Sequence, residues 1–352
     1  MHSILHLSKF YLPRLGGIES AVKSITECPK LAFNHTVLTN SDHNEINKIS
    51  KNISVINRKS FSIFSQPISL TYCFWYIMNR KKFSIIHLHL PNYISALLVA
   101  VFPPTNLIVH WHASIDKVHE KTFFYLLKIL ELRILKLSKK IIVGTKKYAK
   151  GTKILANFEN KIEYIPYGCK SFNIDKIKKE NILVSVGRLV SYKGYLELIE
   201  KIKIPKNWSW KIIGNGPLSE KIKTAISKKN NIELHSNLNN EQVKVFLSKS
   251  KIFLFPSLTR QESYGISQIE AMSAGCVPVN FDIPGSGVSE LIDNNLNGFS
   301  VEHKNYSLFN KSISRLTSDD ETFYNFSKEA IFKYKKSFTN EIFSSKISSI
   351  YM

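Results

Sequence analysis

Short apolar stretches alternate with longer amphipathic ones along the whole chain. The apolar stretches are rich in Ile, Leu and Val, as is typical of buried strands. The amphipathic stretches, such as 18–27 and 119–137, have the residue pattern of helices. This alternation predicts βα units and parallel sheets, and therefore an α/β protein. The expected strands are 3–7, 35–39, 84–90, 107–112, 140–145, 181–189, 210–217, 231–237, 251–257 and 276–281.

The βα units form two series, which predicts two doubly wound domains in tandem. The first series ends with a strand that stops at Pro166, and a polar, lysine-rich stretch follows Gly168. The length of 352 residues also favours two domains over one. We expect one domain over 1–168, a second over 169–335, and a helical tail over 336–352 that packs back on the first.

Cysteine use and hydropathy indicate a cytoplasmic protein without a membrane span. The four cysteines form no CxxC pair and lie far apart, which favours a reducing compartment. The first residues lack the basic start of a secretory signal. The longest apolar run, 93–102, is much shorter than the roughly 18 residues that a spanning helix needs.

The formal net charge of +22 indicates either a compositional bias or anionic partners. Lysine supplies most of it, and an AT-rich genome alone produces such a bias. Among partners, phosphate-bearing ligands and an anionic membrane are favoured over nucleic acid, because the chain has no zinc-finger spacing and no RNP-type motif.

The segment 120–140 is apolar on one side and basic on the other. Two interpretations stay open: an ordinary packed helix, and a surface helix that rests on an anionic bilayer. In the second interpretation, the residues that face lipid phosphates are Lys128, Arg133, Lys136, Lys139 and Lys140.

Four strand-to-helix loops are candidates for binding a ligand, because open α/β sheets bind ligands beyond the carboxyl ends of their strands. Paired glycines let backbone N–H groups approach a ligand closely, and cations suit a diphosphate. A helix start also favours an anion. The four loops contain Gly16–Gly17, Arg188 with Lys193, Gly214–Pro217 including Asn215, and Gly265 before a helix that begins near Ile266.

Two glutamates flank the last of these loops. Glu262 precedes the expected helix and Glu270 lies inside it. Carboxylates repel a diphosphate, so their useful partners are hydroxyl groups. We therefore expect each glutamate to hold a sugar, while backbone N–H groups from Ser263 and Tyr264 to Ile266 hold the phosphates between them.

The paired histidines in "HLH" (87–89) and "HWH" (110–112) resemble metal ligands, since residues two apart in a strand share a face. No carboxylate or third ligand is evident nearby in the sequence. Histidines with ordinary hydrogen bonds are the favoured interpretation, and we expect no metal.

The ordered set of motifs resembles the glycosyltransferases of the GT4 group, which have the GT-B fold. The resemblance covers nearly the whole chain and is most specific in the second half. Tyr264 and Tyr167 depart from it, at positions where phenylalanine and asparagine are common. The matching motifs are "GGIE" (16–19), "YIPYG" (164–168), "GRLVSYKG" (187–194), "GNGP" (214–217), "FPS" (255–257), the E-x7-E pair and "EAMSAGCVPV" (270–279).

The resemblance implies two Rossmann-like domains that face a deep cleft and an enzyme that transfers a hexose with retention of configuration. The donor would be a UDP- or GDP-sugar and no metal or other cofactor would be needed. The acceptor would be a glycan, lipid-linked at the inner face of the membrane, in O-antigen, capsule or lipopolysaccharide synthesis. It implies that Arg188 and Lys193 bind the diphosphate and that Glu270 holds the ribose.

For the remaining site, the resemblance implies that Glu262 and the backbone of 263–266 hold the donor hexose and its phosphate. Gly16 and Gly17 would close on the phosphates, and His112 would lie near the donor sugar. Two alternatives stay open: another GT-B enzyme with a soluble acceptor, such as a phosphorylase or a sucrose- or trehalose-type synthase, and a basic nucleic-acid-binding protein without enzymatic activity.

Overall fold

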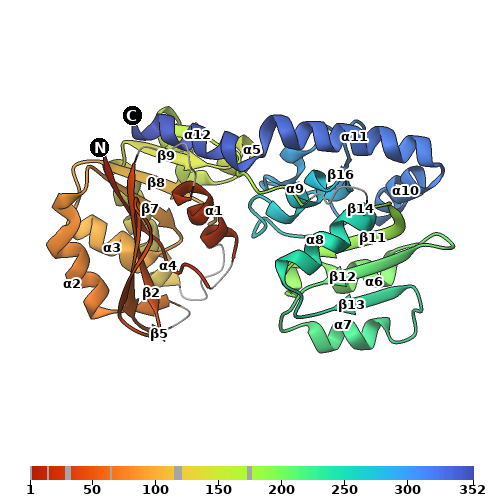
Figure 1. Cartoon of the computed structure of the whole chain (residues 1–352), viewed down its shortest axis with the longest axis horizontal. Coiled ribbons are helices and arrows are strands. Elements are labelled where there is room, and N and C mark those ends of the chain that lie inside the picture. Colours follow the sequence, from red (N-terminus) through yellow and green to blue (C-terminus); the bar gives the residue numbers. More distant parts are fainter. Residues whose placement is uncertain (1, 14–15, 28–32, 64–65, 115–120, 173–176) are drawn as a thin grey trace. The chain divides into compact units, whose positions relative to one another are not determined.

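The computed structural model describes residues 2–13, 16–27, 33–63, 66–114, 121–172 and 177–352. They form two compact units, Met1–Gly168 with Asn340–Met352, and Cys169–Thr339 (Figure 1). Each unit contains a mainly parallel sheet with helices, so the predicted α/β class with two doubly wound sheets is confirmed. All ten expected strands are present.

The first unit is built on an eight-stranded sheet of order β10-β9-β8-β7-β1-β2-β4-β3. Every neighbouring pair is parallel except β3 and β4, and β5 and β6 form a separate hairpin. The sequence did not predict β3, because its residues are mostly exposed and lack an apolar pattern. The strands are β1 (Ser3–Leu7), β2 (Asn34–Ser41), β3 (Glu45–Ser50), β4 (Ile53–Lys59), β5 (Phe61–Ile63), β6 (Gln66–Ile68), β7 (Ile85–Leu90), β8 (Leu107–Trp111), β9 (Lys140–Val143) and β10 (Ile162–Tyr164).

The helices of the first unit connect these strands, and the last one comes from the end of the chain. Short 3₁₀ segments occur at η1 (Arg80–Lys82) and η2 (Lys153–Lys161). Among the described residues, no helix is both long and apolar enough to cross a bilayer. The α-helices are α1 (Gly17–Thr26), α2 (Leu70–Asn79), α3 (Tyr93–Val101), α4 (Lys121–Leu137), α5 (Lys146–Lys150) and α12 (Asn340–Tyr351).

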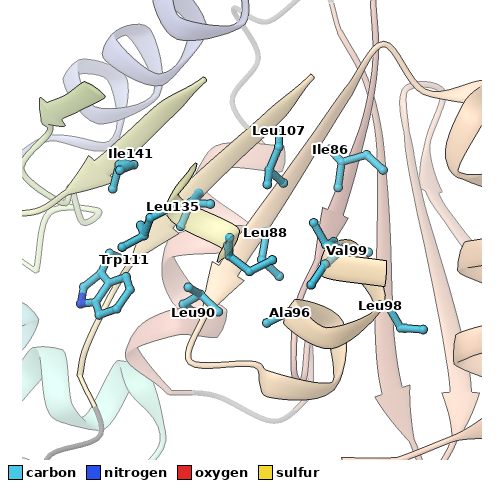
Figure 2. Close-up of a cluster of buried hydrophobic side chains, with 14 of the residues drawn as sticks. Ile86, Leu88, Leu90, Ala96, Leu98, Val99, Leu107, Trp111, Leu135 and Ile141 are labelled. Atoms are coloured by element: carbon cyan, nitrogen blue, oxygen red, sulfur yellow. The ribbon is translucent and has the colours of Figure 1, made fainter. Parts of the chain in front are cut away.

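One face of this sheet carries an aliphatic core. Because side chains alternate across a strand, every second residue of β7 and β8 faces the same way. Leu88 and Leu90 of β7, with Val109 and Trp111 of β8, pack there against α3 and α4 (Figure 2). Burying this surface is the main stabilising term of the unit.

The opposite face of the same strands carries buried histidines. His87 and His89 alternate with the leucines of β7, and His110 lies in β8. Helix α12 covers this face, where the Tyr351 hydroxyl lies 2.6 Å from Nδ1 of His87. The whole layer, all buried, consists of His6, His35, His87, His89, His110 and His112.

The second unit is a six-stranded, fully parallel sheet of order β13-β12-β11-β14-β15-β16. The order reverses between β11 and β14, which are neighbours although a long stretch of sequence separates them. Open α/β sheets bind their ligands beyond the carboxyl ends of the strands at such a reversal of strand order. The strands are β11 (Glu180–Val186), β12 (Ser209–Ile213), β13 (Ile232–His235), β14 (Ser250–Phe255), β15 (Val277–Asp282) and β16 (Phe299–Glu302).

The helices of the second unit complete its βα units. Helix α11 ends at Ser337, and α12, which follows it, belongs to the first unit. The α-helices are α6 (Tyr195–Lys201), α7 (Ser219–Ile226), α8 (Asn240–Lys249), α9 (Ile266–Ser273), α10 (Tyr306–Thr317) and α11 (Asp320–Ser337), with 3₁₀ segments η3 (Ser191–Lys193) and η4 (Val288–Leu291).

The histidine layer is expected to make the first unit sensitive to acid. Burial lowers the pKa of His35 to about 4 and that of His112 to about 3, whereas an unfolded histidine titrates near 6.5. Between pH 6.5 and about 4 the unfolded chain therefore binds more protons than the folded one. The free energy of unfolding should fall by about 1.4 kcal/mol per pH unit for each such histidine.

Hydrogen exchange of backbone amides at pH 7.5 and pH 5, corrected for intrinsic rates, measures this effect. Protection in β7 and β8 should decrease at pH 5, whereas β11 and β12 of the second unit serve as the internal control. Equal protection of β7 at both pH values would contradict the prediction.

Candidate active site

The loops after β11 and β14 meet beyond the carboxyl ends of these strands, where the strand order reverses. Leu258 N–H donates to the Tyr192 carbonyl at 2.8 Å and ties the two loops together. At Gly194, φ is +68°, and a Cβ there would lie 2.2 Å from the Pro256 carbonyl oxygen. A larger residue at position 194 would therefore force the loops apart.

A buried ion pair joins the two loops. Lys193 Nζ contacts Glu262 Oε2, and the side chains are only 10% and 13% exposed. Burial lowers the pKa of Lys193, but the charge and hydrogen bond of Glu262 together with the hydroxyls of Tyr195 and Tyr192 outweigh it, and the pKa is raised overall. Ser257 Oγ donates to the same carboxylate oxygen at 3.1 Å. Lys193 is thus held in its charged form at the edge of the sheet.

The stretch between Glu262 and the start of α9 is fixed by its neighbours. Ser286 Oγ donates to the Glu262 carbonyl at 2.5 Å, and Gly287 N–H donates to the Ser263 carbonyl at 3.0 Å. Tyr264 is buried, and Gly265 adopts φ of +98° immediately before Ile266. The predicted glycine turn and the predicted helix start are both present. The first N–H groups of a helix lack intrahelical acceptors and favour an anion.

Glu270 lies inside α9, slightly more than one turn from its start. It is half-buried, and its carboxylate has no hydrogen-bond or ion-pair partner among the residues that the structure describes. Burial raises the pKa of Glu270 to about 7. A carboxylate that is desolvated without a partner is costly, so this arrangement suits a ligand that donates hydrogen bonds.

The loop after β12 packs against the loop that carries Arg188. Leu189 N–H donates to the Asn215 carbonyl at 2.9 Å, and a Cβ at Gly214 would lie 1.9 Å from the Gly187 carbonyl oxygen. The Asn215 side chain is exposed, although its Oδ1 accepts from Asn237 N–H at 3.1 Å. Arg188 is also exposed, and within the described part of the chain its guanidinium has no ion-pair partner.

The structure therefore gathers the predicted residues of the second unit at adjoining loops of one sheet edge. The set combines the exposed guanidinium of Arg188, the ion-paired ammonium of Lys193 and the N-terminus of α9. It also contains two carboxylates, one ion-paired and one without a partner in the described part of the chain. Cations and amide groups stabilise phosphate oxygens, and carboxylates accept hydrogen bonds from hydroxyls. The arrangement is chemically suited to a phosphate that is flanked by polyhydroxylated groups.

The predicted residues Gly16, Gly17 and His112 lie in the first unit, and their meeting with the second-unit set stays a prediction. Gly17 is the first residue of α1, with Gly16 at its N-cap. A Cβ at Gly16 would lie 2.5 Å from Oε2 of Glu19. The carboxylate of Glu19 thus already lies near this helix start, where an anionic ligand would have to displace it.

His112 uses both of its ring nitrogens inside the fold. Nδ1 lies 2.7 Å from the Tyr167 hydroxyl, and Nε2 lies 3.0 Å from Nδ1 of His89. Any contact of this ring with a donor sugar therefore requires it to exchange one of these partners. This contact could not be predicted from sequence, because Tyr167 is far from His112 along the chain.

The histidine layer does provide third ligands that the sequence did not reveal. His6 of β1 joins His87 and His89, and their ring nitrogens lie within 4.8 Å of one another, as do those of His89, His110 and His112. However, a bound metal lies in the plane of each imidazole ring. The rings of His110 and His112 stack at 4.0 Å with an interplanar angle of only 16°.

Nearly parallel rings do not direct their lone pairs at one point. Several imidazoles of the layer are linked instead by hydrogen bonds between neutral rings: His6 Nε2 lies 2.9 Å from His35 Nδ1, and His6 Nδ1 lies 3.1 Å from His89 Nε2. The ring nitrogens of His110 have no hydrogen-bond partner in the described part of the chain. The expectation of no metal at these pairs stays a prediction, which the ring geometry supports.

Sequence reasoning also missed the supporting contacts of the second unit. It assigned Lys193 to a diphosphate and Glu262 to a sugar without predicting that they pair with each other. Ser257 belongs to the quoted "FPS" motif, which was a signal for its role, whereas Ser286 lies in a loop that gave none.

Comparison with known proteins agrees with this geometry. Residues 170–332 match the family described as "Glycosyl transferases group 1". O-antigen chain mannosyltransferase C from Escherichia coli is 22% identical over 96% of this chain and 94% of its own length. D-rhamnosyltransferase WbpZ from Pseudomonas aeruginosa is 22% identical over 96% of this chain and 92% of its own.

A solved structure shows the same fold over the whole chain. HepE from Anabaena, in complex with UDP and glucose, superposes with a TM-score of 0.77 at 15% identity and covers 100% of this chain and 99% of its own. Membership of an enzyme family sets aside the alternative of a non-enzymatic nucleic-acid-binding protein. Through residues 170–332 the chain belongs to the group 1 glycosyltransferases of the GT4 group, and it is a glycosyltransferase with the GT-B fold.

Proposed function

We propose that this enzyme transfers a hexose, with retention of configuration, from UDP- or GDP-hexose to a lipid-linked glycan in bacterial surface polysaccharide synthesis. The observation that carries the proposal is the set of Arg188, Lys193, Glu262, Glu270 and the start of α9 at one sheet edge. The enzyme works in the cytoplasm at the inner face of the membrane and needs no metal or other cofactor.

The two full-length relatives support the surface-polysaccharide part of the proposal. One is named for mannose transfer in O-antigen chains and the other for D-rhamnose transfer. The solved neighbour contains UDP and glucose, which supports a nucleotide-sugar donor. The nucleotide base, the hexose and the acceptor of this enzyme are inferred from its similarity to these proteins, so they are part of the proposal.

The chemistry follows from the charge that develops on the leaving nucleoside diphosphate. Arg188 is exposed and free to form two parallel hydrogen bonds with phosphate oxygens. The N–H groups at the start of α9 add fixed dipoles that need no reorganisation as the charge forms. Lys193 carries three N–H donors, so its bond to Glu262 leaves others for the same phosphate.

The two glutamates are proposed to hold the sugars on either side. Glu270, half-buried and without a partner in the described chain, accepts hydrogen bonds from the ribose hydroxyls. Glu262, fixed by Lys193 and Ser257, accepts from the donor hexose. A front-face displacement, in which the leaving phosphate assists the incoming acceptor, follows from the resemblance to GT4 enzymes.

Nucleotide binding and turnover test the function directly. UDP or GDP at 100 times its dissociation constant should stabilise the protein by about 2.7 kcal/mol, which raises its melting temperature. Arg188→Ala should lower kcat for release of UDP or GDP from the sugar nucleotide by about 100-fold, because a preorganised cation opposite the leaving group is lost. Membrane extracts supply the lipid-linked acceptor in this assay.

The matched control is Lys221→Ala, which removes an exposed cation from α7 without touching the site. Both variants should melt at the wild-type temperature. Stabilisation by inorganic phosphate but by no nucleotide would favour the phosphorylase alternative, and wild-type turnover by Arg188→Ala would contradict the proposal.

The proposed role of Glu270 predicts a pH-dependent affinity. Because its pKa is raised to about 7, the carboxyl group is mostly protonated at pH 6 and mostly ionised at pH 8. Only the ionised form accepts hydrogen bonds from both ribose hydroxyls. The dissociation constant for UDP or GDP should therefore be about 10-fold higher at pH 6 than at pH 8.

Isothermal titration calorimetry of the wild type and of Glu270→Gln at both pH values checks this. The glutamine variant should bind weakly, with a much smaller pH dependence. If the variant retains the full pH dependence, the titrating group is another residue and the role of Glu270 is wrong.

A further inference from the structure

Large apolar side chains are exposed unequally in the two units. In the described part of the second unit they are scattered, with two on α11 and one each on α8, on α10 and in the turn before β16. In the first unit, three consecutive helices of one layer, α2, α3 and α4, each present several of them to solvent. Helices α2 and α3 are in contact, as are α3 and α4 (Figure 1).

On each of these helices the exposed apolar residues follow helical spacing. The stripe on α2 consists of Leu70, Phe74 and Met78, which are 81%, 67% and 61% exposed. Buried residues of the same helix, such as Tyr72 and Tyr76, face the sheet instead. The stripe therefore lies on the solvent side of a well-packed helix and does not contribute to the core.

Helices α3 and α4 repeat this arrangement. Leu97 and Val101 of α3 are 53% and 58% exposed, and Tyr125, Leu126 and Ile129 of α4 are 59–68% exposed. The opposite side of α4 packs in the core through Leu127, Ile134 and Leu135. The packed-helix interpretation of segment 120–140 is therefore confirmed for the described part of α4, whose outer side is also apolar, and contact of that side with a bilayer stays a prediction.

Basic residues follow the apolar stripes at the ends of two of these helices. On α4, Arg133 and Lys136 continue the exposed side after Ile129. After α2, Lys81 and Lys82 are exposed in η1. Because the three helices lead to the amino ends of β7, β8 and β9, which are strands of the same parallel sheet, they run in the same direction. The basic residues therefore lie toward one border of the layer.

Several of the basic residues that were expected to face lipid phosphates make contacts within the protein instead. Arg133 Nε donates to the Ala100 carbonyl, Lys128 pairs with Glu131, and Lys140 pairs with Glu163. Of the cations named from the sequence, Lys128 and Lys140 are thus engaged within the fold. Apolar side chains, rather than a row of lysines, are the dominant feature of the outer side of α4.

We propose that the outer side of α2, α3 and α4 is a membrane-docking surface that inserts its apolar stripes into an anionic phospholipid bilayer. The inference deepens the proposed function and rests on it, because a lipid-linked acceptor requires the enzyme to work at the bilayer. Apolar stripes bordered by cations are the arrangement that binds the interface between head groups and acyl chains. The net charge of +22 adds attraction to anionic lipids.

Sedimentation with vesicles of phosphatidylglycerol and phosphatidylethanolamine tests the surface. The double variant Phe74→Ser/Leu126→Ser removes one exposed side chain from each of two stripes and should weaken vesicle binding at least 10-fold. The matched control, Tyr324→Ser/Phe332→Ser, removes two side chains on α11 that are 50% and 58% exposed. It should bind within about 2-fold of the wild type, and phosphatidylcholine vesicles should bind all three proteins weakly.

Three results would overturn the proposal: no binding of the wild type to anionic vesicles, equal binding by the Phe74/Leu126 variant, or an equal loss in the control. Light scattering of the proteins without vesicles provides a further check. If the wild type is a dimer and the Phe74/Leu126 variant is a monomer, this face is an interface between two copies of the chain instead. The thermal shift with UDP or GDP, measured in parallel, distinguishes failure of this proposal from failure of the proposed function. Vesicle binding without nucleotide binding would support the membrane-docking surface and refute the proposed function.

Discussion

The buried ion pair between Lys193 and Glu262 is the interaction on which the candidate active site depends. It joins the loops that follow β11 and β14, the two strands between which the sheet order reverses. Removing two charges from water is expensive, and the cost is recovered only where each has a close partner and further hydrogen bonds. Ser257 supplies one such bond. The pair therefore fixes both loops, and with them Arg188 and the start of α9, in one arrangement.

Much of the fold could be predicted because its central strands are buried on both faces and are rich in Ile, Leu, Val and Phe. The strands β7, β8, β11 and β14 belong to this group. Strand β3 escaped prediction because it lies at a sheet edge with its residues exposed. The E-x7-E pair, the glycine before α9 and the helix start were also predictable, because local turn chemistry determines them.

What could not be predicted depends on strand order and on contacts between distant residues. β1 lies next to β7, so His6 joins His87 and His89 although some eighty positions separate them. The pairing of Lys193 with Glu262 has the same origin, since β11 and β14 become neighbours only in the folded sheet. Likewise, hydropathy alone did not show that α4 packs one apolar side in the core and exposes another.

A double-mutant cycle on the buried pair is the most direct test of this account. Hydrogen exchange of β11 and β14 amides would give the free energy of unfolding of the second unit for Lys193→Met, Glu262→Gln and the double variant. Each single substitution leaves one buried charge or polar group unpaired and should cost about 3 kcal/mol or more. The double variant should lose clearly less than the sum of the two. Strictly additive losses would show that the two side chains do not depend on each other, and the central role of the pair would be wrong.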